Sequence, residues 1–160
     1  MARLDRITNP DVARLCGYLE ATQYAFMQGQ YDMLLEAHVF RIGASDVTEG
    51  EIIEAAYPDA NPLLDKYDAV ASENMKGRVN AELSLRRGDW NPDVPGIPNI
   101  IEARLREGFR KHLNESFPLE AARAVECDPD TPYVNLGGFT YILFAKGGDS
   151  CLLLVCNVMD

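Results

Sequence analysis

The sequence is poor in the residues from which catalytic and metal sites are most often built. It has two histidines, His38 and His112, a single tryptophan, and four cysteines of which none forms a CxxC pair. Neither a GxxxxGK[ST] loop nor a GxGxxG loop is present, so nothing predicts a phosphate cradle. We therefore expect no catalytic residue, no metal and no cofactor, and an enzyme is the less favoured class.

The remaining candidates for metal-binding or catalytic residues have little support from the residues around them in the sequence. His112 and Glu115 are one helical turn apart, a spacing that many helices have by chance. Cys16 paired with a histidine would be a nucleophile only if flanking residues activated it, and it falls on an apolar helical stripe. His38 lies beside apolar residues, which favours a hydrogen-bonded core histidine.

Long apolar runs are also absent. No stretch approaches the roughly 18 residues that span a bilayer, and the first ten residues lack the apolar region of a signal peptide. We predict a cytoplasmic protein with reduced cysteines and no membrane partner.

Basic residues are scarce relative to acidic ones. The chain has 15 Lys and Arg against 25 Asp and Glu, a net charge of −10. Between residues 46 and 73 eight acids accompany one base, Lys66, which gives −7. This balance argues against direct nucleic-acid binding and favours a basic protein partner. The candidate interaction residues are Asp46, Glu49, Glu51, Glu54, Asp59, Asp65 and Asp68, together with Trp90.

Helix start signals occur at three places. Asn9-Pro10 offers a capping residue followed by proline at the first helical position. Thr48-x-x-Glu51 is a capping box that predicts a helix from about Glu49 to Tyr57, and Pro98 opens an amphipathic stretch. Apolar spacing predicts further helical stretches over residues 31–39, 61–70 and 119–125.

The C-terminal region has the clearest strand pattern. Residues of about 133–145 and 150–158 are rich in β-branched and aromatic types, and a Gly-Gly turn separates them, which predicts a β-hairpin. Both segments are apolar on both faces, so we expect covered faces. Residues 78–87 fit a strand or a helix, with the strand favoured, and three prolines make about 88–98 a loop. The predicted fold is one α+β domain over residues 1–160, with four to six helices packed on a small antiparallel sheet built around that hairpin.

A small acidic chain without catalytic motifs resembles, in composition alone, toxin-neutralising immunity proteins and phage-encoded inhibitors of defence enzymes. The leading hypothesis is a stoichiometric inhibitor that covers a basic channel of a toxin or nucleic-acid-handling enzyme. One alternative is an enzyme or ligand-binding protein with a pocket between the hairpin and the helices, lined by Tyr133, Tyr141, His112 or Cys16. A second is a homo-oligomer that forms through the last strand, if this strand lies at a sheet edge.

Overall fold

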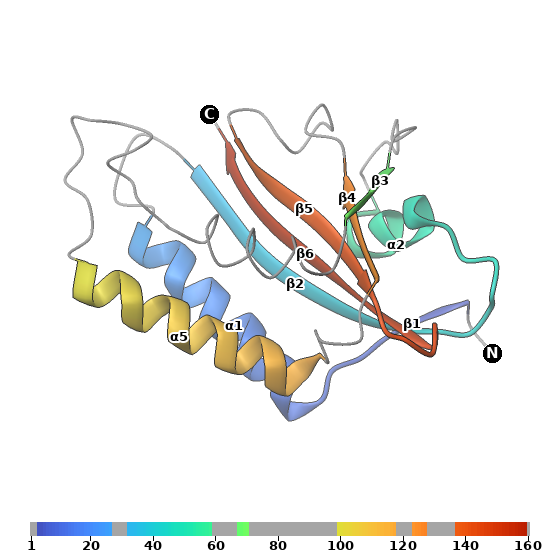
Figure 1. Cartoon of the computed structure of the whole chain (residues 1–160), viewed down its shortest axis with the longest axis horizontal. Coiled ribbons are helices and arrows are strands. Elements are labelled where there is room, and N and C mark those ends of the chain that lie inside the picture. The colour runs from blue at the N-terminus through green and yellow to red at the C-terminus, as the bar shows by residue number, and fades with distance from the viewer. Residues whose placement is uncertain are drawn as a thin grey trace.

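A computed structural model describes residues 3–26, 32–58, 67–70, 99–117, 123–127 and 137–159. These residues form helices and strands that alternate along the chain (Figure 1). The predicted strand or helix at 78–87 and the predicted loop at 88–98 lie outside the described residues. The elements in chain order are β1 (Leu4–Arg6), α1 (Pro10–Phe26), β2 (Asp32–Ile42), α2 (Glu49–Ala56), β3 (Tyr67–Val70), α5 (Asn99–Ser116), β4 (Arg123–Cys127), β5 (Gly137–Phe144) and β6 (Ser150–Met159).

The six described strands form one sheet in the order β1-β2-β6-β5-β4-β3, and every neighbouring pair is antiparallel. The α+β class with an antiparallel sheet is therefore confirmed. β6 lies inside the sheet, because it pairs with β2 on one side and with β5 on the other. The prediction that the last strand is an edge strand is wrong, so pairing of this strand with a second copy has no basis.

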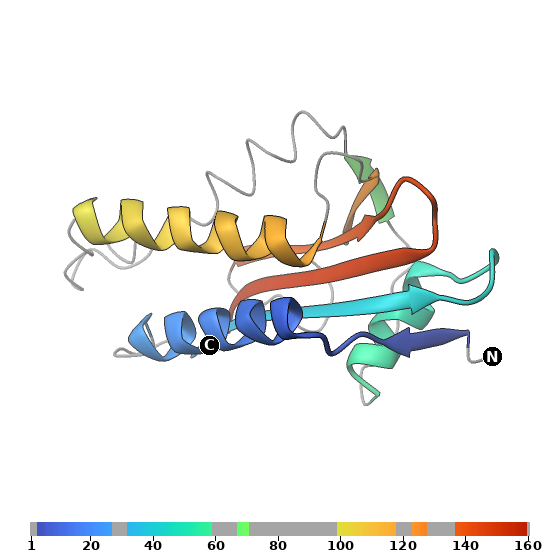
Figure 2. The same cartoon turned by 90° about the horizontal axis from the view of Figure 1, so that it is seen from below.

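Helices cover both faces of the sheet. α1 and α5 lie side by side on one face, and the short α2 lies on the other (Figures 1 and 2). Successive residues of β6 alternate between these faces: Leu152 and Leu154 join the cluster under α1 and α5, whereas Leu153 and Val155 join the cluster under α2. The unbroken apolar run of β6 follows from burial on both sides.

The helix start signals of the sequence coincide with observed helices. The Asn9 side chain accepts a hydrogen bond from Val12 N at 2.9 Å, so Asn9 caps α1 as predicted. α2 begins at the predicted capping box, and α5 begins directly after Pro98.

Three predicted helical stretches, over 31–39, 61–70 and 119–125, are wrong where the structure describes them. Most of residues 31–39 belong to β2, residues 67–70 of the stretch 61–70 form β3, and residues 123–127 form β4. The described residues accordingly contain three helices, fewer than the four to six predicted. Both faces of β2 are covered, so its sequence does not alternate between apolar and polar residues as a half-exposed strand does. Its apolar spacing therefore fits a helix as well as a strand.

Side chains of α1 cover the part of β2 that extends beyond the short β1. Leu35 N donates to Gln23 Oε1 at 2.9 Å, and Cys16 Sγ donates to the carbonyl of Ala37 at 3.2 Å. Ile7 N donates to the carbonyl of Val39, where the β1 pairing ends. α1 thus contributes hydrogen-bond partners to this strand as well as an apolar face.

Candidate functional site

The structure brings only part of the predicted acidic set together. Asp46, Glu49, Glu51 and Glu54 lie in one short segment, the turn before α2 and α2 itself. Asp68 lies on β3, at the far edge of the sheet from β1. Asp59, Asp65 and Trp90 lie outside the described residues.

The N-terminus of α2 is fixed by the predicted capping box. Glu51 N donates to Thr48 Oγ1 at 3.3 Å, and Thr48 N donates in return to Glu51 Oε2 at 2.9 Å. The two bonds satisfy backbone N–H groups that a helix start otherwise leaves without a partner. Behind the cap, Ile52 and Ile53 are buried against the sheet, so α2 is held at a defined orientation.

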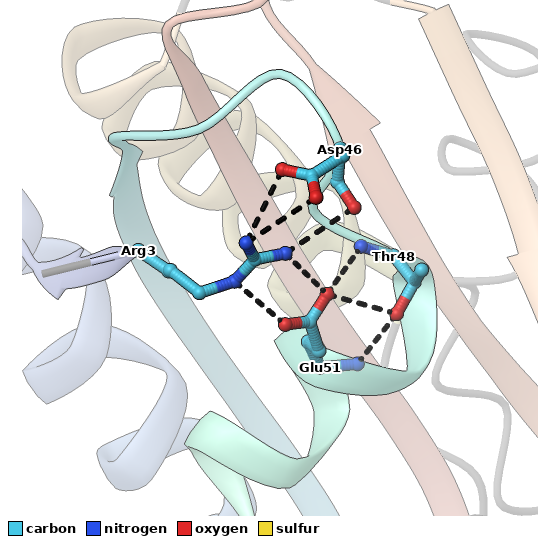
Figure 3. A network of polar contacts seen from close by, with 4 residues as sticks. All are labelled: Arg3, Asp46, Thr48 and Glu51. Atoms are coloured by element: carbon cyan, nitrogen blue, oxygen red, sulfur yellow. Dashed lines mark hydrogen bonds and ion pairs between the residues drawn. The ribbon is translucent and has the colours of Figure 1, made fainter.

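Arg3 adds a second set of contacts at the same place. Its Nε donates to Glu51 Oε1 at 3.0 Å, and its Nη1 donates to Asp46 Oδ1 at 3.2 Å (Figure 3). Hydrogen bonds from the Arg3 side chain and from Thr48 N lower the pKa of Glu51 to about 2. The same two carboxylates raise the pKa of Arg3. This contact could not be predicted from local spacing, because Arg3 is 48 positions from Glu51.

The four acids of this segment do not share one face. A helix turns about 100° per residue, so Glu51 and Glu54 lie opposite the buried Ile52 and Ile53, while Glu49 projects on their side. Glu49 is accordingly half-buried and Glu54 is exposed. We define the α2 acidic surface as Asp46, Glu51 and Glu54.

This surface retains a negative charge. Arg3 offsets one of its three carboxylates, and the Asp46 side chain remains 74% exposed. Solvent-facing charges act on a partner over about 8 Å at physiological salt and are largely screened beyond that distance.

A second polar cluster, which the sequence did not predict, lies at the other end of α2. It consists of Arg6 from β1, Glu36 and His38 from β2, and Tyr57, the C-cap of α2. His38 is 7% exposed and has hydrogen-bonding partners at both ring nitrogens, which agrees with a hydrogen-bonded core histidine. The Glu36-x-His38 spacing would have predicted a shared face if residues 31–39 had been assigned to a strand.

The carboxylate of Glu36 is the main acceptor in this cluster. His38 Nε2 lies 3.1 Å from Glu36 Oε2, and the Tyr57 hydroxyl donates to the same oxygen. The contact with His38 lowers the pKa of Glu36 most, and the bond from Tyr57 lowers it further, against an opposing effect of burial. Glu36 is thus an ionised acceptor for two donors.

The side chains suggested for a pocket pack in or beside the core instead. Tyr141 is fully buried in the cluster under α1 and α5, and Cys16 packs against that cluster. Burial raises the pKa of the Cys16 thiol, which opposes formation of a nucleophilic thiolate. His112 Nδ1 lies 3.5 Å from Glu115 Oε2, and its ring contacts Tyr18. Tyr133 lies outside the described residues.

Two searches of the described part of the chain were negative. It contains no group of three or more His, Cys, Asp or Glu side chains arranged to hold a metal ion. None of its helices combines the length and the apolar character that crossing a bilayer requires.

Comparison with known proteins yields a structural similarity only. No protein-family model matches the chain, and no curated protein matches it in sequence. The crystal structure of citrus MAF1 superposes with a TM-score of 0.55 at 13% sequence identity, over 93% of this chain and 98% of the MAF1 chain. At this identity the match supports a shared fold: this chain has a fold similar to that of citrus MAF1.

Proposed function

We propose that the protein is a stoichiometric inhibitor that binds a basic protein through the α2 acidic surface. The observation that carries the proposal is the presentation of Glu51 and Glu54 on a helix held by its cap and by two buried isoleucines, with Asp46 in the turn directly before it. A preordered surface loses little conformational entropy on binding. The net charge of −10 supports attraction to a basic partner.

The partner class follows from the charge. A protein that binds nucleic acid presents Lys and Arg along its channel, and an acidic helix can occupy that channel in place of phosphates. Charge complementarity mainly accelerates association and fixes the orientation of the two proteins. A toxin or a nucleic-acid-handling enzyme in the cytoplasm is the proposed target.

The contacts of Glu51 decide which substitutions test this proposal. Reversal of Glu51 would break the capping box and the Arg3 contacts, so a loss of binding would be ambiguous. Glu54 lies on the α2 acidic surface but has no part in the cap, and Glu54→Lys changes the local charge by two units. The matched control is Glu20→Lys, which makes the same charge change at an exposed position of α1, on the opposite face of the sheet.

The experiment is capture from a lysate of the natural source on the wild-type protein and on both variants, at about 50 mM and 500 mM salt. We expect the wild type and the control to retain the same basic protein at low salt, with release at high salt. The Glu54→Lys variant should lose it while its circular dichroism spectrum stays unchanged. Retention of the protein by this variant, or equal loss from the control, would argue against the α2 acidic surface.

A further inference from the structure

The polar cluster of Arg6, Glu36, His38 and Tyr57 connects three elements at one buried histidine. Arg6 Nη2 lies 2.9 Å from His38 Nδ1. On the other side of the ring, His38 Nε2 lies 3.1 Å from Glu36 Oε2 and 3.2 Å from the Tyr57 hydroxyl oxygen. β1 therefore contacts one ring nitrogen, and the C-terminal end of α2 contacts the other.

Hydrogen-bond chemistry fixes the protonation state of His38 in this arrangement. A guanidinium group has donors only, so His38 Nδ1 must accept through its lone pair. The proton of the neutral ring is then on Nε2, where it faces the Glu36 carboxylate and the Tyr57 oxygen. The observed network thus requires neutral His38 in the Nε2–H form.

Protonation of Nδ1 is incompatible with the contact to Arg6. The imidazolium ion has N–H donors at both nitrogens, so Arg6 would face a donor and a like charge at 2.9 Å. The contacts at Nε2 are unaffected in kind, because a protonated ring still donates to Glu36. Protonation of His38 therefore breaks the contact at Nδ1 and keeps the contacts at Nε2.

We propose that His38 is a proton-operated switch for the N-terminal strand: its protonation expels Arg6 and loosens β1, while the C-terminal end of α2 stays attached through Glu36 and Tyr57. β1 is suited to such release because it is three residues long and lies at a sheet edge. Its pairing with β2 ends at Arg6 opposite Phe40, followed by the hydrogen bond from Ile7 N to Val39 O.

The described surroundings of His38 supply no other charged group that would compensate. β1 contributes Arg6, β2 contributes Glu36, and α2 contributes Tyr57 at its C-cap. On β6 the residue opposite His38 is Leu153, and the neighbouring ring on β2 is Phe40. Cys16 of α1 bonds the carbonyl of Ala37 and packs against the cluster on the opposite face of the sheet.

Amide hydrogen exchange followed by NMR tests the switch on the intact protein between pH 8 and pH 5, the interval in which histidine side chains ordinarily titrate. Protection factors, which correct for the intrinsic pH dependence of exchange, are compared at Ile7 N–H, directly after β1, and at Tyr57 N–H, which donates to Ile53 O. We expect protection at Ile7 to fall about tenfold or more on acidification, since a hydrogen bond to a charged donor is lost. Protection at Tyr57 should stay within about twofold.

The two histidines provide the matched variants. His38→Gln should abolish the pH dependence at Ile7, whereas His112→Gln should retain it. Constant protection at Ile7 in the wild type, or the same fall in His38→Gln, would overturn the proposal. If His38→Gln does not fold, the imidazole ¹⁵N shifts of the wild type at pH 8 decide: the Nε2–H form is required, and a ring protonated at Nδ1 would contradict it.

Discussion

At the scale of single residues, Glu51 combines a helix-capping contact with a contact to a residue distant in the chain. One carboxylate oxygen accepts from Thr48 N and from Arg3 Nη2, and the other accepts from Arg3 Nε. It therefore links the helix cap to the segment before β1. Its pKa of about 2, against an ordinary value of 4.5, makes the folded state depend on ionised Glu51.

The pH dependence of this stabilisation has a definite sign. Because the folded-state pKa is depressed, the contribution of Glu51 is fully present above about pH 4.5 and is lost as the pH falls through about 2. We expect Glu51→Gln to lower the free energy of unfolding at pH 7, and expect the difference from the wild type to shrink steadily below pH 4.5. Urea denaturation at a series of pH values measures it.

Glu49→Gln is the control for this prediction. It removes the same charge from the same first turn of α2 but leaves the cap and the Arg3 contacts in place. A difference between Glu51→Gln and the wild type that stays constant from pH 7 down to pH 2.5 would show that ionisation of Glu51 contributes nothing.

The sequence predicts contacts between residues close in the chain far better than contacts between distant ones. Thr48 and Glu51 could be paired because a capping box has a fixed local spacing. Arg3 and Arg6 could not be assigned to the two ends of α2, because their positions depend on β1 pairing with β2. The acidic site was accordingly predicted without its internal counter-ion.

At the scale of elements, the crossing of α1 and α5 depends on Gly108. A Cβ built on this residue would lie 2.6 Å from the Tyr18 hydroxyl oxygen and 2.9 Å from the ring carbon that bears it. The hydroxyl cannot move freely, since it donates to the carbonyl of Leu105 at 2.7 Å. Gly108 thus allows a tyrosine of α1 to lie across the backbone of α5.

Gly108→Ala should therefore lower the free energy of unfolding by about 1 kcal/mol or more, because the overpacking exceeds the gain in helix propensity. Gly17→Ala is the control, since a Cβ at Gly17 of α1 meets nothing within 4 Å. That change should stabilise the protein by up to about 1 kcal/mol. Thermal and urea denaturation measure both.

The same substitution in a Tyr18→Leu protein separates the steric contact with Tyr18 from the change in helix propensity at Gly108. In a Tyr18→Leu protein the hydroxyl and ring are gone, so Gly108→Ala should become neutral or stabilising. Stabilisation by Gly108→Ala in the wild-type background would mean that Tyr18 yields at no cost, which contradicts the packing argument.

Elements with explicit end signals were predicted correctly, and elements defined by their neighbours were not. Asn9 and Thr48 specify helix starts within a few residues, so α1 and α2 were assigned correctly. The segment of β4 contains Ala124 and Val125, and its alanine-rich approach favours a helix locally. Pairing with β3 and β5 overrides that preference. The residues around β4 in the chain do not reveal this pairing, because β3 and β5 are distant segments.

At the scale of the whole molecule, the sheet has two covered faces of very different size. Two helices of 17 and 18 residues lie over one face, and α2 has only 8 residues. Yet Leu153, toward α2, is as fully buried as its neighbour Leu154, which is 1% exposed toward α1 and α5. Both faces should therefore contribute to one cooperative core.

We expect Leu153→Ala and Leu154→Ala each to lower the free energy of unfolding by about 2–5 kcal/mol, because each leaves a cavity in a close-packed cluster. Lys146→Ala, in the exposed turn between β5 and β6, should change it by less than about 0.5 kcal/mol. Urea denaturation provides the comparison. A much smaller effect of Leu153→Ala than of Leu154→Ala would indicate that the α2 face is loosely packed.

The side chains by which α1 covers β2 have a consequence for how copies of this protein behave together. A long strand with open N–H and C=O groups is a template for another chain, and such pairing leads to aggregation. Gln23 occupies Leu35 N and Cys16 occupies the carbonyl of Ala37, so β2 offers fewer groups to a neighbour. α1 thereby leaves this edge of β2 less open to pairing with another copy of the chain.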